Sequence, residues 1–335
     1  MRGARIRVLA GAVLLVALAP PAWAGGSNYG VAPGSRPALD GKVSEWPVPT
    51  PKFARDPAAA PDGNIYIAVM HGNKIARFET KSQAFKEWDL PPGAHPHGLL
   101  VDRSGLVWYT GNGNGTIGRL DPATGKVTEF KTPSGGGAPH TLVIDDAQTT
   151  IWFTLQRGDK IGRLDVKTGQ ITEFKTRNGP YGIALDKAGH VWFCQLGGDS
   201  LGRLDPKTGT VSEYPMGDGS RPRRMATAPD GSLWVTFFGN GKLARVDPAT
   251  GKIARLYDLP AGASGGPYAV NVDAAGLVWA NEISTDTVVR LDPGSGTMRV
   301  FQLPSRGVGI RKMVVDAQGR LWYMGSHNGR LGLVE

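Results

Sequence analysis

Residues 96–130 read PHGLLVDRSGLVWYTGNGNGTIGRLDPATGKVTEF and contain four short runs, GLLVD, LVWYT, TIGRL and KVTEF. Each run is rich in β-branched or aromatic residues, which is typical of β-strands. The connection DPATG, which begins at Asp121, joins the last two runs and contains the residues that favour a tight reversal. The stretch therefore predicts one sheet of four antiparallel strands.

The same pattern recurs along the whole chain. A marker aromatic stands in the second run of each copy, every 40 to 45 residues: Tyr66, Trp108, Trp152, Trp192, Trp234, Trp279 and Trp322. Eleven residues after the first six markers come Arg77, Arg119, Arg163, Arg203, Arg245 and Arg290, and twenty-two residues after them come Trp88, Phe130, Phe174, Tyr214, Leu256 and Phe301. A four-stranded repeat of about 40 residues is the blade of a β-propeller.

The seventh copy is incomplete and predicts how the ring closes. It stops at Glu335 after its third strand, whereas KVSEW at 42–46 copies the KVTEF run ahead of the first blade. Joining both ends in one blade leaves no open sheet edge between the first and last repeats. We predict an all-β, seven-bladed β-propeller over residues 41–335, with four antiparallel strands per blade and the last blade closed by strand 42–46.

The N-terminal residues have the features of a secretory signal. Three arginines within the first seven residues precede an apolar run at 8–19, and Ala22-Trp23-Ala24 offers small residues at both recognition positions of a cleavage site. We expect a signal peptide at 1–24, a flexible Gly/Ser/Pro-rich leader at 25–40, and export to the periplasm or the medium. The alternative, an uncleaved anchor, has an apolar run too short to span a bilayer comfortably.

Composition excludes several classes of function. The chain has 335 residues, 48 Gly and 25 Pro, as expected for a turn-rich globular protein. Its formal net charge of +9 falls to +6 without the three N-terminal arginines, and no Lys/Arg cluster predicts nucleic-acid binding. The single cysteine, Cys194, excludes an internal disulfide and is expected to be a buried, inert thiol in a monomer.

Seven copies of one unit separate scaffold from site. Positions that recur in every blade serve the blade, and we expect the strand arginines to pair with the outer-strand carboxylates Glu129, Glu173 and Glu213. Positions that differ between blades at the channel mouth can serve a ligand. Innermost strands begin there, and the residues that precede the markers by eleven or twelve positions, here called the ring residues, are Arg55, His97, His140, Tyr181, Arg223, Tyr268 and Arg311.

The ring residues are all cationic, titratable or phenolic, which indicates a functional mouth. We also expect the residues just past the aromatic strands at this mouth: His71, Asn112, Gln156, Gln195, Phe238, Glu282 and His327. Five of the six histidines, His71, His95, His97, His140 and His327, then share one face. Such histidines could act as a general base or bind a metal, or the mouth could simply bind an anion. A candidate metal set is His71, His95, His327 and Glu282.

The repeat text resembles the streptogramin B lyase (virginiamycin B lyase) family. It is carried by GPYGIALDKAGHVWF at 179, PHGLLVDRSGLVWYT at 96 and IGRLDPATGKVTEFKTP at 117. The resemblance implies a seven-bladed propeller that confers antibiotic resistance by opening the lactone ring of cyclic depsipeptides through elimination. The family's working motifs are matched by Pro96-His97, Pro139-His140 and Pro180-Tyr181. This implies His140 as general base, with His97 and Tyr181 orienting the substrate.

The resemblance also implies Mg²⁺, but the positions of its carboxylate ligands differ here. The family has a glutamate two residues before its histidine, where this chain has Ala138 or His95, and a second one where it has Gln156 or Asn112. Magnesium prefers anionic oxygen ligands, so these residues should hold it poorly.

Two hypotheses follow from the sequence. The first is an exported lyase-like enzyme for an ester-containing or lactone small molecule, with Arg55, Arg223, Tyr268, Arg311, Gln156 and Asn112 binding the substrate. The second is a non-catalytic periplasmic binding or scaffold propeller for an anionic ligand, either a small molecule or a peptide-like fragment. Neither hypothesis involves nucleic acid or a stable membrane span after signal cleavage.

Overall fold

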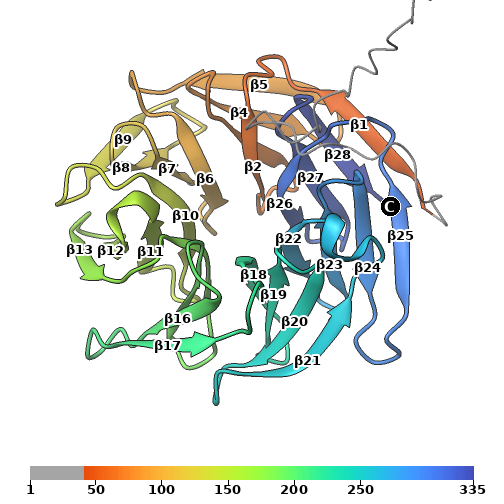
Figure 1. The fold of residues 1–335 in the computed structure, drawn as a ribbon. Helices are drawn as coiled ribbons and strands as arrows, with labels where there is room; N and C mark the ends of the chain where they lie inside the picture. Colours follow the sequence, from red (N-terminus) through yellow and green to blue (C-terminus); the bar gives the residue numbers. More distant parts are fainter. Residues whose placement is uncertain (1–40) are drawn as a thin grey trace, which may run out of the picture.

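The repeat forms seven separate antiparallel sheets, which stand side by side in a ring around a central channel (Figure 1). This computed structural model describes residues 41–335. In each sheet the strands follow chain order from the channel outward, except that β1 joins β26, β27 and β28. The predicted seven-bladed propeller is confirmed.

Blade 1 contains β2 (Ala54–Ala59), β3 (Ile65–Val69), β4 (Lys74–Glu79) and β5 (Ala84–Asp89), and blade 2 contains β6 (Pro96–Val101), β7 (Val107–Gly111), β8 (Thr116–Leu120) and β9 (Val127–Lys131). Blade 3 contains β10 (Pro139–Ile144), β11 (Thr150–Leu155), β12 (Lys160–Asp165) and β13 (Ile171–Lys175), and blade 4 contains β14 (Pro180–Leu185), β15 (Val191–Gln195), β16 (Ser200–Leu204) and β17 (Val211–Pro215). Blade 5 contains β18 (Pro222–Thr227), β19 (Leu233–Phe237), β20 (Lys242–Asp247) and β21 (Lys252–Asp258), and blade 6 contains β22 (Pro267–Val272), β23 (Val278–Glu282), β24 (Thr287–Leu291) and β25 (Met298–Gln302). Blade 7 contains β26 (Ile310–Val315), β27 (Leu321–Gly325), β28 (Arg330–Val334) and β1 (Val43–Pro47), and short 3₁₀ turns lie at η1 (Gln156–Gly158) and η2 (Gly262–Ser264).

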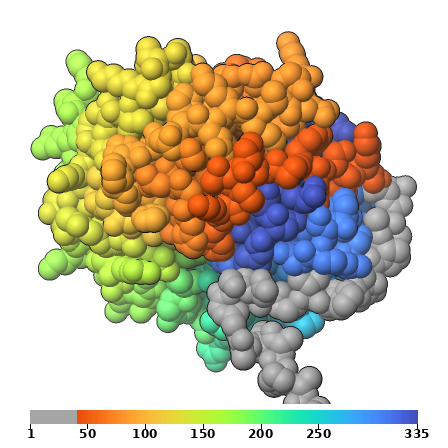
Figure 2. Space-filling model, turned by 90° about the horizontal axis from the view of Figure 1, so that it is seen from above, coloured from red at the N-terminus to blue at the C-terminus, as the bar shows by residue number. Residues whose placement is uncertain are grey.

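The two ends of the described chain close the ring within blade 7. Strand β1 pairs with β28 from Val43 opposite Val334 to Pro47 opposite Arg330. Figure 2 shows this junction on the surface, where the red N-terminal segment lies directly against the blue C-terminal one. Because β28 is paired on both sides, the last repeat has no open edge against β1.

The signal peptide predicted at 1–24 and the leader predicted at 25–40 lie outside the described residues. Within 41–335, no helix has the length and apolar character needed to cross a membrane.

Four of the six strand arginines contact two aromatic rings each, which corrects the predicted pairing with outer-strand glutamates. The Arg119 guanidinium lies 5.3 Å from the ring centre of Trp108 and 5.9 Å from that of Phe130. Arg163, Arg203 and Arg290 make the same double contact in their own blades. The outer-strand glutamates have other partners, as when Glu129 accepts a hydrogen bond from the Tyr109 hydroxyl at 2.9 Å. Cation–π contact replaces the expected ion pairs at these four arginines. Arg77 and Arg245 do pair with carboxylates, but with Glu79 and Asp230 rather than with an outer-strand glutamate.

One predicted outer-strand position is off by one residue. In blade 5 the pairing of β20 with β21 shifts between Arg245 and Val246, so the partner of Leu243 is Tyr257. Tyr257 packs against the marker Trp234 with ring centres 5.5 Å apart, whereas Leu256 is 44% exposed. A bulge adds one residue to a strand and moves every later side chain to the other face.

Candidate functional site

Every innermost strand carries an irregularity where it reaches the channel mouth. In blade 2 the register shifts between Pro96 and Leu99, so His97 and Gly98 together face a single partner residue. The first strand of each of the other six blades has a shift at the matching place. A β-bulge bends its strand and redirects a side chain. The bulges therefore explain how each blade presents one ring residue to the channel.

Side chains of the second strands fix these bulges and connect neighbouring blades. The Gly98 backbone N–H donates to the Thr110 hydroxyl at 2.7 Å, and that hydroxyl donates to the His140 carbonyl of the next blade at 2.9 Å. Thr154 and Thr236 make equivalent bonds, and the Asn281 amide does so in blade 6. These residues were not predicted from the sequence. Their signal is a Thr or Asn two positions after the marker aromatic.

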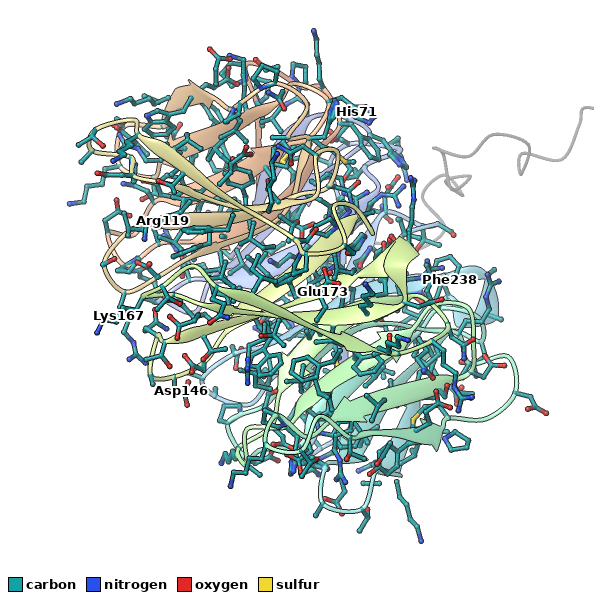
Figure 3. The ribbon with its side chains drawn as sticks, turned by 90° about the vertical axis from the view of Figure 1, so that its left-hand side faces the viewer. His71, Arg119, Asp146, Lys167, Glu173 and Phe238 are labelled. Carbon is teal, nitrogen blue, oxygen red and sulfur yellow. The ribbon has the colours of Figure 1, made fainter. Side chains whose placement is uncertain are left out.

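All seven ring residues line one cavity of about 250 Å³ at the mouth. The predicted Asn112 and Gln156 also line it, together with Phe53, Met70, Ala138, Arg157 and Leu196. Figure 3 gives the side view, with His71 and Phe238 at the face of the mouth and Asp146 and Lys167 at the opposite face. The lining contains arginine, histidine, tyrosine and amide groups but no carboxylate, so the mouth favours an anionic ligand.

His97 is a neutral imidazole with both ring nitrogens engaged. Its Nδ1 lies 3.1 Å from the backbone carbonyl of His140, which can only accept, so Nδ1 carries the proton. Its Nε2 then accepts a hydrogen bond from the Arg55 guanidinium at 2.5 Å. Burial, and next the charge of Arg55, hold the pKa of His97 well below its usual range. His97 orients Arg55 and has no free lone pair for a substrate proton.

His140 lies between His97 and Tyr181, with ring centres 3.7 Å and 4.1 Å away. Its Nδ1 is 2.8 Å from the Thr141 hydroxyl, which accepts a hydrogen bond from Arg224 at 2.6 Å. Among residues 41–335, only His140 Nδ1 is placed to accept the single Thr141 proton. This arrangement puts the imidazole proton on Nε2. Burial and then Arg224 hold the pKa of His140 well below its usual range.

Two tyrosines complete the aromatic arc of the mouth. The hydroxyls of Tyr181 and Tyr268 are hydrogen-bonded to each other although they come from blades 4 and 6. Burial, and next the charge of Tyr268, raise the pKa of Tyr181. Burial alone would raise the pKa of Tyr268, but nearby arginines, Arg311 first, outweigh it and lower the pKa to about 7. The two phenols are therefore chemically unequal.

The ring arginines stack on aromatic faces. Arg223 lies 4.2 Å from the ring centre of Phe238 and 5.1 Å from that of Tyr268, and Arg311 lies 5.5 Å from the rings of both Phe53 and Tyr268. Within the described chain, neither Arg223 nor Arg55 is paired with a carboxylate. Stacking holds the planar guanidinium of Arg223 while its N–H groups stay available for an oxyanion.

A second layer of charge lies one residue further along the innermost strands. The Asp56 carboxylate is fully buried, with its oxygens 3.6 Å from Arg224 and 3.8 Å from Lys312. Lys312 also donates to the Leu99 carbonyl at 2.9 Å. These residues and Thr141 were not predicted from the sequence. Their only sequence signal is that a charged or hydroxyl side chain directly follows the ring residue. In blade 2 the same position is occupied by Gly98.

The candidate metal residues do not converge. His71 and His95 are exposed at the rim with ring centres 6.5 Å apart, while His327 accepts a hydrogen bond from Arg311 at 3.1 Å. Glu282 does not reach the mouth: it is fully buried and accepts hydrogen bonds from Ala261 N–H at 2.6 Å and the Thr287 hydroxyl at 3.2 Å. Gln195, also expected at the mouth, is fully buried and donates to Glu213.

The residues at the mouth do not fit Mg²⁺. The position two residues before each ring residue, where the resemblance places a metal-binding glutamate, has a left-handed backbone in all seven blades and carries a carboxylate in none of them: Phe53, His95, Ala138, Gly179, Arg221, Gly266 and Gly309. No group of three or more His, Cys, Asp or Glu side chains within 41–335 could hold a metal ion. The guanidinium groups that line the cavity would also repel a divalent cation.

Comparison with known proteins agrees with this architecture. The structure matches a streptogramin B lyase with a TM-score of 0.81 and 26% identity, covering 90% of this chain and 99% of that one. It matches virginiamycin B lyase from Staphylococcus aureus with a TM-score of 0.80 and 21% identity, covering 88% and 99%.

A propeller in the hydrazine synthase of Kuenenia stuttgartiensis shares the fold at a TM-score of 0.73 and 14% identity, covering 85% of this chain and 96% of that one. No curated protein matches the chain significantly. The virginiamycin B lyase family model matches residues 34–176 and 141–335, which together span the whole propeller. The chain therefore belongs to the virginiamycin B lyase family.

Proposed function

We propose that this exported, lyase-like propeller opens an ester or lactone bond of an anionic small molecule by elimination, without a metal ion. A base removes the proton α to a carbonyl, the C–H electron pair forms a carbon–carbon double bond, and the ester carboxylate leaves from the β carbon with the C–O electron pair. When the ester lies within a ring, the product is linear and has the mass of the substrate.

One observation carries the proposal: the ring residues of a lyase-family propeller converge on a cavity that contains guanidinium groups and no carboxylate. Arg55, Arg223 and Arg311 supply positive charge where a carboxylate leaving group and an enolate-like oxygen develop. Preorganised donors of this kind stabilise such charges strongly in a water-poor site. They take the part that a metal ion would otherwise play as Lewis acid.

Elimination is tested by mass spectrometry of a type B streptogramin such as quinupristin, and of a panel of smaller lactones, after incubation with the purified protein. We expect a linear product of unchanged mass whose formation is equal with and without EDTA. Arg223→Met should lower kcat/KM at least tenfold. His190→Ala, on the opposite face, is the matched control and should retain full activity.

Two results would count against the proposal. A product heavier by one water would mean hydrolysis rather than elimination. No product from any ester, combined with binding of the intact compounds, would mean that the mouth is a binding site only.

A further inference from the structure

The proposed elimination needs a proton acceptor, and the hydrogen bonds of the mouth argue against both histidines. His97 uses one ring nitrogen as donor to the His140 carbonyl and the other as acceptor from Arg55. His140 accepts the Thr141 proton at Nδ1, because within residues 41–335 this nitrogen is the only acceptor within hydrogen-bond distance of that hydroxyl. His140 therefore presents an N–H at Nε2, which is a donor and not a base.

No other common base lies in the cavity. Its lining contains no carboxylate and no lysine, and Asp56, which lies in the layer below, is not among the lining residues. The cavity does contain two phenols that contact each other, Tyr181 and Tyr268. A phenol is a base only as a phenolate, so one of the two must be stabilised in its charged form.

Positive charges surround Tyr268 from several elements. Arg223 of β18 lies 5.1 Å and Arg311 of β26 lies 5.5 Å from its ring centre. The charges of Arg55 of β2 and Arg224 of β18 also lower its pKa, and the Tyr181 hydroxyl of β14 is hydrogen-bonded to its oxygen. Other titratable groups contact these arginines: His97 accepts from Arg55 and His327 accepts from Arg311. The Asp56 carboxylate lies 3.6 Å from Arg224 and is also faced by Lys312 at 3.8 Å. The environment of Tyr268 thus favours a negative oxygen.

We propose that Tyr268 is the proton acceptor of this mouth, held as a phenolate by the arginines and by the Tyr181 hydroxyl. The inference rests on the proposed elimination. The Tyr268 oxygen takes the α proton and becomes a neutral phenol, the C–H pair forms the double bond, and the carboxylate leaves with the C–O pair. His140 Nε2–H donates to the carbonyl oxygen next to the α carbon. Release of the proton to solvent restores the phenolate.

Two features agree with this assignment. The pKa of Tyr268 is lowered and that of Tyr181 raised, so the proton shared by the pair belongs to Tyr181. The contact between the two oxygens also keeps the phenolate aimed into the cavity that both side chains line.

The decisive measurement is an ultraviolet absorbance titration of the ligand-free protein, because phenolate absorbs at longer wavelength than phenol. We expect one tyrosine to ionise near pH 7, well below the value of about 10 of a free phenol. The neutral-pH step should be absent in Tyr268→Phe and retained in Tyr214→Phe, an outer-strand control. Arg311→Met should move the step to higher pH, which tests the cause independently if Tyr268→Phe folds poorly.

Activity then separates the roles of the residues. Loss of a general base costs roughly 10²–10⁴-fold in rate, and Tyr268→Phe should show a loss of this size. His140→Asn should lose less and keep the same midpoint of the pH–rate profile. The proposal would be overturned, even if elimination is observed, if no tyrosine ionises near neutral pH. It would also be overturned if the neutral-pH step persists in Tyr268→Phe. If the neutral-pH titration step is found as expected but no ester is turned over, the proposed function is refuted and Tyr268 remains a stabilised phenolate.

Discussion

A pair of substitutions in blade 4 tests how the blades are packed. The third-strand residue Gly202 lies opposite Phe193, and a Cβ atom built on Gly202 would be 2.1 Å from the Phe193 ring. Aromatic residues face glycine in three further blades, at Tyr109–Gly118, Phe153–Gly162 and Tyr323–Gly332. Where the second strand has a smaller residue, the third strand has a larger one, as in Ile67–Ala76, Val235–Ala244 and Ala280–Val289. The pair therefore conserves volume within each blade.

The magnitudes follow from this complementarity. Gly202→Ala forces overlap with Phe193 and should cost about 1–3 kcal/mol of unfolding free energy. Phe193→Val removes a fully buried ring, and the cavity should cost about 2–4 kcal/mol. The double variant recreates the Val–Ala pair of blade 5, so it should be more stable than the sum of the single losses by about 1–2 kcal/mol.

The assay is equilibrium unfolding in guanidinium chloride, followed by tryptophan fluorescence on the four proteins of the cycle. The comparison requires equal slopes with denaturant, because a changed slope would mean that the transition is no longer two-state. If the losses of unfolding free energy in the two single variants add up to the loss in the double variant, the reasoning is refuted. Such a result would show that the side chains at positions 193 and 202 do not compete for the same space.

Two further predictions concern protonation and reactivity. Folding lowers the pKa of three histidines, His97, His140 and His327, and burial and Arg311 lower that of His327 to about 4. The folded protein therefore gains stability from keeping these imidazoles neutral. This gain is complete above pH ~6.5 and is lost as the pH falls toward 4. The melting temperature should fall over that window, and a constant value would contradict the burial of neutral imidazoles. Cys194 is fully buried and its thiol pKa is raised by that burial, so a thiol reagent should label it only in denaturant; rapid labelling of native protein would contradict this.

The sequence predicted the blades well because a propeller repeats its constraints. The marker aromatics, strand arginines and hairpin turns recur at near-constant spacing, so each blade supports the prediction for the others. The ring residues could be placed for the same reason, by counting back from the marker. The contact of Arg119 with Trp108 and Phe130 was not predicted. The sequence places both aromatic residues and a glutamate near each strand arginine, and it does not show which of them the guanidinium contacts.

The prediction failed where one residue decides which way a side chain points. Glu282 and Gln195 stand three positions after their markers, whereas Gln156, which lines the cavity, stands four after. Side chains alternate along a strand, so a one-residue difference moves a group from the channel to the interior of the blade. The Arg224–Thr141 hydrogen bond joins residues 83 positions apart across the channel, and no local pattern could have indicated it.

One electrostatic arrangement accounts for the chemistry of the mouth. A guanidinium about 5 Å from a phenol, at an effective dielectric constant near 20, stabilises the phenolate by roughly 3 kcal/mol, or about two pKa units. Arg223 and Arg311 together can therefore offset the few units by which burial opposes a charged Tyr268. The same charges oppose protonation of His97 and His140 and repel a divalent cation. A mouth lined by arginines and by no carboxylate thus disfavours an imidazolium while favouring a phenolate and an anionic leaving group, which is what the proposed metal-free elimination requires.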